Sequence, residues 1–216
     1  MRRLRVRLIS ECLATFCLVF AGTGAIVVDQ ASGGKVGGLG VSLVFGIVVT
    51  AMILTLGRVS GAHMNPAVTV GFWSAGRHRG GEVLPYAAAQ LAGAVAASLA
   101  LRALFADSTT TLGVTLPSGP AAQSFFLEFV MSFILMFVIM GVATGDAAKG
   151  EMAAIAIGAV VALEAAFGGP VSGASMNPAR SFGPALVSWN FGHHWLYWVA
   201  PVLGCLLGVR AHRALD

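Results

Sequence analysis

The chain has 216 residues, of which 57% are hydrophobic and 10% are charged, and its mean hydropathy is +0.84. Soluble domains carry about 25% charged residues, so this composition excludes a soluble globular protein and predicts an integral membrane protein. The formal net charge is +4, but most basic residues stand at the ends of apolar stretches, which indicates contact with the lipid bilayer and argues against a nucleic-acid partner.

Six apolar stretches are long enough, or nearly so, to cross roughly 30 Å of hydrocarbon as helices. In chain order they are Leu8–Val28, Gly38–Gly57, Val83–Ala106, Ala121–Ala143, Glu151–Phe167 and Phe191–Val209. The arginine-rich start before the first stretch resembles the beginning of a signal peptide. This stretch is longer than the usual apolar region of about 7–15 residues, so we expect an uncleaved first span.

The positions of lysine and arginine predict the orientation of the spans. With six crossings, most of these residues fall on one side of the membrane: Arg2, Arg3, Arg5, Arg7, Arg58, Arg77, Arg79, Lys149, Arg210 and Arg213. The loop Asp107–Pro120, on the other side, has no lysine or arginine, while Lys35 and Arg102 are exceptions. The pattern places both termini in the cytoplasm and indicates a multi-pass protein of the inner (plasma) membrane.

Two further apolar segments, Ser60–Ser74 and Ser172–Ser188, are too short to cross the membrane. Each begins with a copy of one phrase, "SGAHMNPAV" or "SGASMNPAR", and the copies match at seven of nine positions. A second pair of segments also resemble each other: "ECLATF" begins at Glu11 in the first span, and "EFVMSF" begins at Glu128 in the fourth. Each half therefore has three spans and one short segment. Because three is odd, the second half enters from the opposite side, which predicts inverted repeats over about 8–106 and 121–209 within one transmembrane domain, 1–216.

Asn65-Pro66 and Asn177-Pro178 each predict the start of a short helix, because asparagine is a good N-cap and proline suits the first helical position. About ten residues give a helix of roughly 15 Å, so two such half-helices would meet near the membrane midplane. Irregular backbone survives at that depth only when it is buried in protein or lines a watery cavity. We expect its carbonyls to face that cavity at Gly61, Ala62, His63, Gly173 and Ser175.

These motifs carry a family resemblance. Six spans, an arginine after the second motif and two Asn-Pro-Ala motifs resemble the aquaporin and glycerol-facilitator (major intrinsic protein) family; the motif residues are Asn65, Pro66, Ala67, Asn177, Pro178 and Ala179. The phrase "GPVSGASMNPARSFGPAL" is especially similar to the bacterial and plant nodulin-type branch. The resemblance covers the whole chain. It implies an all-α, aquaporin-like membrane fold of six transmembrane helices plus two re-entrant half-helices, and a homotetramer with one pore per subunit.

The two asparagines predict how a channel of this kind would treat its solutes. If each side-chain oxygen caps its own half-helix, the NH₂ groups of Asn65 and Asn177 stay free to donate to a water or hydroxyl oxygen. Each helix N-terminus carries roughly half a positive charge, so two of them at one point oppose protons and cations.

Arg180 stands in one copy of the phrase only; the other copy has Val68. An intramembrane charge usually faces a wet cavity, so we expect a constriction in the outer half. The family resemblance implies that the selectivity filter there consists of Phe45, Ala165, Ala174 and Arg180. Water-selective members usually carry histidine in place of Ala165. We therefore expect a wider pore that passes water and glycerol, urea or neutral metalloid acids, with a water-selective channel as the alternative.

Glu11, Glu128 and Glu164 lie within spans, where they could couple protons or support the structure. We favour support, in which they accept hydrogen bonds from re-entrant backbone N–H groups. For His63, a neutral hydrogen-bonded ring is favoured over a pH gate.

Three rival functions stay open at this point. An ion-coupled secondary transporter also uses inverted repeats, and a junctional or scaffold protein could use the same fold. An enzyme is disfavoured because no nucleophile–base pair is recognisable. Motifs for a metal, a nucleotide or another cofactor are also missing, so we expect none to be bound.

Overall fold

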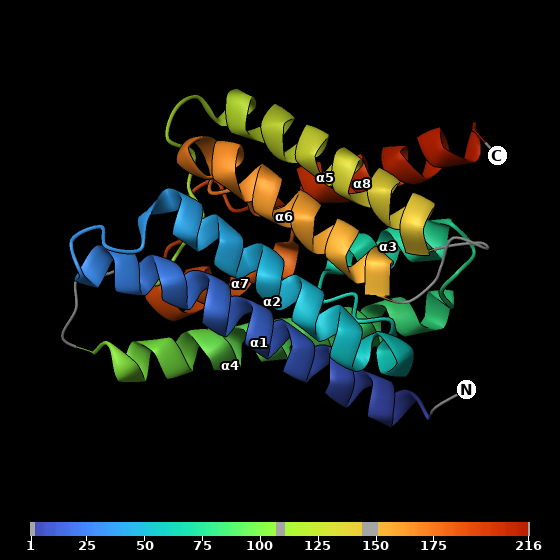
Figure 1. The fold of residues 1–216 in the computed structure, drawn as a ribbon, viewed down its shortest axis with the longest axis horizontal. Coiled ribbons are helices and arrows are strands. Elements are labelled where there is room, and N and C mark those ends of the chain that lie inside the picture. The colour runs from blue at the N-terminus through green and yellow to red at the C-terminus, as the bar shows by residue number, and fades with distance from the viewer. Residues whose placement is uncertain (1–2, 107–110, 144–150, 216) are drawn as a thin grey trace.

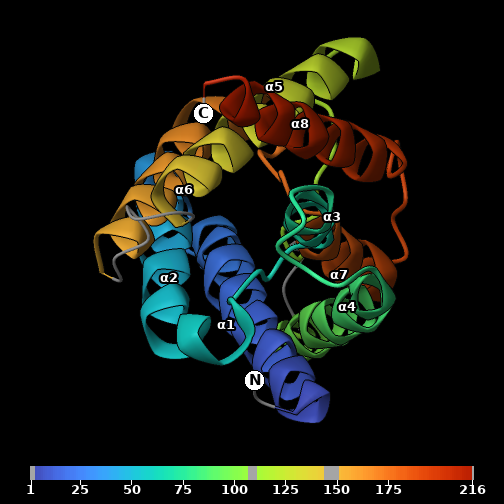
Figure 2. The same cartoon turned by 90° about the vertical axis from the view of Figure 1, so that its right-hand side faces the viewer.

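The computed structural model describes residues 3–106, 111–143 and 151–215, which fold into eight helices. These are α1 (Leu4–Ala31), α2 (Gly37–Ser60), α3 (Pro66–Ser74), α4 (Gly80–Leu104), α5 (Ala121–Ala143), α6 (Glu151–Ser172), α7 (Pro178–Ser188) and α8 (Leu196–Arg213). Of these, the six long helices run along the molecule, and the short helices α3 and α7 lie among them (Figures 1 and 2). The expected six spans and two half-helices are therefore confirmed.

The bounds of several expected spans differ from those of the helices, most clearly for α6 and α8. Helix α6 does not end at Phe167 but continues through Pro170 to Ser172. It can do so because its last carbonyls find partners in distant parts of the chain: Ser118 Oγ donates to Pro170 O, Ser118 N donates to Val171 O, and Tyr197 Oη donates to Ser172 O. Helix α8 begins at Leu196 instead of Phe191, after residues 192–195 have formed turns, and it continues to Arg213.

Length and composition agree with a multi-pass membrane protein. Among the described residues, α1, α2, α4, α5 and α6 are long and apolar enough to cross a membrane. Helix α8 has 18 residues but carries Arg210, His212 and Arg213 in its last turn. Helix α1 begins and α8 ends at the same end of the molecule (Figure 1). Of the basic residues used to orient the chain, Arg2 and Lys149 lie outside the described ranges.

The two halves pack in corresponding ways. Helix α1 packs along α4, and α5 packs along α8 in the other half. Each half-helix crosses to the opposite half, since α7 packs on α4 and α3 packs on α8 (Figure 2). Helices α2 and α6 join the halves so closely that a Cβ at Gly46 would lie 2.5 Å from Gly158 O. Small residues allow such close approach between helices in membranes.

Candidate pore

Both half-helices begin at an asparagine cap. Asn65 Oδ1 accepts a hydrogen bond from Ala67 N at 2.9 Å, with Pro66 at the first helical position. Asn177 Oδ1 likewise accepts from Ala179 N at 2.9 Å. The caps satisfy N–H groups that the start of a helix leaves without partners.

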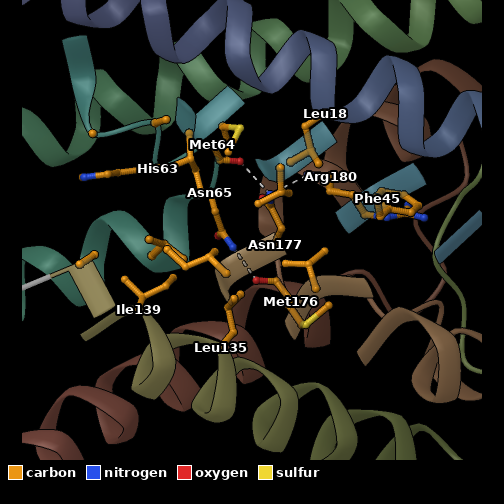
Figure 3. A pocket seen from close by; sticks show the side chains of 18 of the residues that line it. Leu18, Phe45, His63, Met64, Asn65, Leu135, Ile139, Met176, Asn177 and Arg180 are labelled. Atoms are coloured by element: carbon orange, nitrogen blue, oxygen red, sulfur yellow. Dashed lines mark hydrogen bonds between the residues drawn. The ribbon is translucent and has the colours of Figure 1, made fainter. Parts of the chain in front are cut away.

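The asparagine amides also hold the two re-entrant segments together. Asn65 Nδ2 donates to Met176 O at 2.7 Å, and Asn177 Nδ2 donates to Met64 O at 2.7 Å (Figure 3). We expected both amide groups to be free for solutes. Since an NH₂ group has two hydrogens, each asparagine keeps one for the cavity after making this bond.

The backbone before each cap has a left-handed conformation at several residues. Gly61 has φ +96°, and its counterpart Gly173 has φ +83°. Non-glycine residues also have positive φ: Ala62 (+47°), Met64 (+53°), Ala174 (+41°) and Met176 (+52°). Each such residue costs on the order of 1–3 kcal/mol and persists only when its surroundings hold it in place.

Glu11 holds the first of these segments. Its Oε1 accepts from His63 N at 2.9 Å and from Ser60 Oγ at 2.7 Å. Its Oε2 accepts from Met64 N at 2.8 Å and from Gln90 Nε2 at 2.8 Å. Because the N–H groups point toward this buried carboxylate, carbonyls on the other side of the segment can face the cavity.

Glu128 has the same arrangement in the second half. It accepts from Ser175 N at 2.8 Å, from Met176 N at 2.7 Å and from Ser172 Oγ at 2.7 Å. The expectation that these acids support the re-entrant backbone matches the contacts of Glu11 and Glu128.

Glu164 does not make the contact that we expected. Its side chain is 1% exposed, and neither carboxylate oxygen has a hydrogen-bond partner among the described residues. Its electrostatic neighbours are Glu128 and Cys205, on α5 and α8. The re-entrant N–H groups of the second segment are already bonded to Glu128, so no support for that backbone comes from Glu164.

Two supporting residues were missed in the sequence. Tyr86 Oη donates to Ser60 O at 2.9 Å, and Tyr197 Oη donates to Ser172 O at 2.7 Å. Each bond satisfies the last carbonyl of a helix that leads into a re-entrant segment. A signal was present, because these are the only tyrosines of the chain and they occupy corresponding spans.

Three cavities follow one another through the molecule. The central cavity, of about 120 Å³, is lined by both motif asparagines and by Gly61, Ala62, His63, Ala174 and Ser175. An outer cavity of about 330 Å³ also reaches Gly173. A third cavity of about 920 Å³ lies toward the start of α1 and meets the central cavity at His63 and Phe72.

Four side chains separate the central cavity from the outer one. Phe45, Ala165, Ala174 and Arg180 line both cavities. Arg180 is 2% exposed; its Nη1 donates to Gly113 O at 2.6 Å, and its guanidinium lies 5.2 Å from the centre of the Phe45 ring. None of the described residues that line these two cavities is acidic.

The His63 ring lies where the central cavity meets the third one. Its Nδ1 is 3.1 Å from Thr69 Oγ1, and the ring stacks on Phe72 with centroids 4.6 Å apart. The rings of His78 and Tyr86 contact it from the side. The geometry therefore fits the favoured interpretation of a hydrogen-bonded histidine.

The chain is similar to known proteins over almost its whole length. The family model described as "Major intrinsic protein" matches residues 3–212. Aquaporin NIP1-2 of Oryza sativa subsp. japonica is 47% identical over 214 residues, which cover 96% of this chain and 71% of that protein. Nodulin-26 of Glycine max is 45% identical over 202 residues, with 94% and 74% covered. The X-ray structure of the aquaglyceroporin from Plasmodium falciparum superposes with a TM-score of 0.85 at 26% identity and covers 96% of this chain and 95% of its own.

Proposed function

This chain belongs to the major intrinsic protein family, and we propose that it is a passive channel for water and small uncharged solutes, with no enzymatic activity. The observation that carries this proposal is the row of three cavities. Neighbouring cavities share lining residues, so they form one path past the two asparagine caps. A passive channel needs such a path and no coupling site.

The proposed selectivity filter consists of the four residues between the central and outer cavities. Ala165 and Ala174 end at Cβ, so only Phe45 and Arg180 contribute bulk there. Glycerol, urea and neutral metalloid acids suit this site because they are larger than water but carry no charge. Arg180 and the asparagine amides offer donors to their oxygen atoms, and the apolar walls accommodate the rest of each molecule.

Exclusion of protons and other cations follows from the electrostatics. The N-termini of α3 and α7 meet between the two caps, and each adds a partial positive charge. Arg180 adds a full positive charge at the filter, with no acidic side chain among the described residues lining either adjoining cavity. A cation would lose its water without gaining a counter-charge.

We also propose how the chain sits in the membrane. Most basic residues of the described ranges lie at the end where α1 begins, which supports cytoplasmic termini in a plasma membrane. The paired supports Glu11 with Glu128 and Tyr86 with Tyr197 favour one channel domain over 1–216 with repeats of about 8–106 and 121–209. We propose a homotetramer with one pore per chain, as the family resemblance implies, and exposed apolar side chains on α2 and α6 leave surface for it.

The substitution Ala165→His tests the proposed filter. A histidine ring would narrow the constriction, so we expect glycerol flux into proteoliposomes to fall about tenfold, which corresponds to about 1.4 kcal/mol at the barrier, with a much smaller loss of water flux. Stopped-flow light scattering measures both. Equal losses for water and glycerol would place Ala165 outside the constriction.

A further inference from the structure

One side of α1 follows the pore. Leu18 lines the central cavity, and Ile26 lines the outer one. Residues four apart share a helix face, so Gly22, midway between them, faces the same path at the level of the filter. The position has no side chain where its neighbours on this face have large ones.

The ring of Phe45 occupies the space that Gly22 leaves open. A Cβ added at Gly22 would lie 2.5 Å from both Phe45 Cδ1 and Phe45 Cζ, and nearer still to Cε1. Such distances are far below van der Waals contact, so the ring and a methyl group cannot share this space. Gly22 lies within α1, so its role here is steric and does not depend on backbone freedom.

Helix α2 has little room to carry Phe45 away from α1. Gly46, the next residue, lies against α6, where a Cβ would be 2.5 Å from Gly158 O. The α2 and α6 backbones are therefore already in close contact at the residue that follows Phe45. The ring itself would have to move, away from α1 and toward the side lined by Ala165, Ala174 and Arg180.

We propose that Gly22 is a specificity-determining residue of the channel. Because it has no side chain, the Phe45 ring can lie against the α1 backbone, and the filter stays wide. Gly22 is a positioning residue that acts through Phe45. This inference rests on the proposed function and adds a position outside the four side chains of the filter.

The substitution Gly22→Ala tests the inference in proteoliposomes. We expect glycerol flux to fall about tenfold while water flux changes less than about threefold, since a displaced ring obstructs the larger solute more. Gly24→Ala is the matched control, because its new Cβ would meet only the end of the flexible Leu101 side chain, at 3.2 Å from Cδ2. The control should leave the ratio of glycerol to water flux unchanged.

A double variant separates action through the ring from a general packing defect. In a Phe45→Ala background, adding Gly22→Ala should leave glycerol flux nearly unchanged. If Gly22→Ala alone does not fold, recovery of folded protein in the double variant supports competition for one space, and failure of both variants to fold overturns the inference.

Two results of the flux measurements would contradict the inference. One is an unchanged ratio of glycerol to water flux in Gly22→Ala, whether both fluxes stay the same or fall equally. The other is a loss of glycerol flux that persists without the Phe45 ring. If the parent channel passes neither water nor glycerol, the proposed function itself fails. If it passes both and Gly22→Ala has no effect, only the role of Gly22 fails.

Discussion

At the scale of single residues, two buried glutamates that were both expected to support the re-entrant backbone have different surroundings. Glu128 accepts three hydrogen bonds, two of them from backbone N–H groups, whereas Glu164 accepts none from the described residues. Glu128→Gln should lower the free energy of unfolding by about 2–3 kcal/mol, because buried donors lose a charged acceptor. Glu164→Gln should leave the free energy of unfolding unchanged or raise it, because burying an unpaired carboxylate costs more free energy than burying an uncharged amide.

Thermal unfolding of the two variants in the same detergent tests this pair of predictions. The substitution is chemically identical at both sites, so each variant is the other's control. Equal destabilisation would mean that Glu164 has a supporting partner after all.

His78, in the loop before α4, predicts a pH dependence of stability. Burial lowers the pKa of its imidazole, and this outweighs the opposing effect of Glu82. The unfolded chain therefore binds a proton more readily than the folded chain, so stability should fall as the pH drops below about 6.5. His78→Phe keeps a ring beside Tyr86, where the centroids are now 4.5 Å apart, and removes the titration.

We expect this variant to lose less thermal stability than the parent between about pH 7.5 and 5.5. Melting temperatures of both proteins at the two pH values provide the measurement. The same decrease in both would show that His78 does not contribute to acid sensitivity.

At the scale of elements, the two half-helices should form the charge barrier together. Asn177→Asp keeps an oxygen to cap α7, but it places a carboxylate where Asn177 now donates to Met64 O. We expect cation leak through proteoliposomes to rise about tenfold or more, a change of at least about 1.4 kcal/mol in the barrier, with α7 still folded.

Asn177→Ser is the control for this prediction, because serine also caps a helix but adds no charge. An ion-sensitive dye inside the vesicles reports the leak, and thermal unfolding reports the fold. A folded aspartate variant with unchanged cation rejection, or an equal leak in the serine variant, would argue against a barrier made by the helix ends.

The elements also show what could be predicted from the sequence. The starts of α3 and α7 were predictable because capping by Asn65 and Asn177 is local chemistry. The end of α6 was not, because its last carbonyls are satisfied by Ser118 and Tyr197, which are distant in the chain.

Long-range contacts also explain the two places at the candidate pore where the structure differs from the expectation. The amide of each motif asparagine bonds to a carbonyl of the opposite half, and no sequence pattern indicated that pairing. Whether Glu164 finds a hydrogen-bond partner among the described residues depends on which neighbours α6 faces. The residues of the proposed filter came from the family resemblance, and the structure brings all four to the boundary of the central and outer cavities.

At the scale of the whole molecule, two halves of similar structure combine around one path. Each half supplies an acid, a tyrosine and a capped half-helix, and the α2–α6 contact holds the halves together. Arg180 breaks this symmetry, because the corresponding position in the first half is Val68. The proposed filter therefore lies on one side of the two caps, and the other side opens into the largest of the three cavities described above.

The central claim is that this path conducts water and small uncharged solutes passively and rejects ions. Stopped-flow light scattering of proteoliposomes under water, glycerol, urea and boric acid gradients, with a pH-sensitive dye inside, tests it most directly. We predict rapid, non-saturating flux of water and at least one of these solutes in both directions, with no proton flux above that of empty vesicles. Saturable flux coupled to an ion gradient, proton conduction, or no flux above that of empty vesicles would contradict the claim.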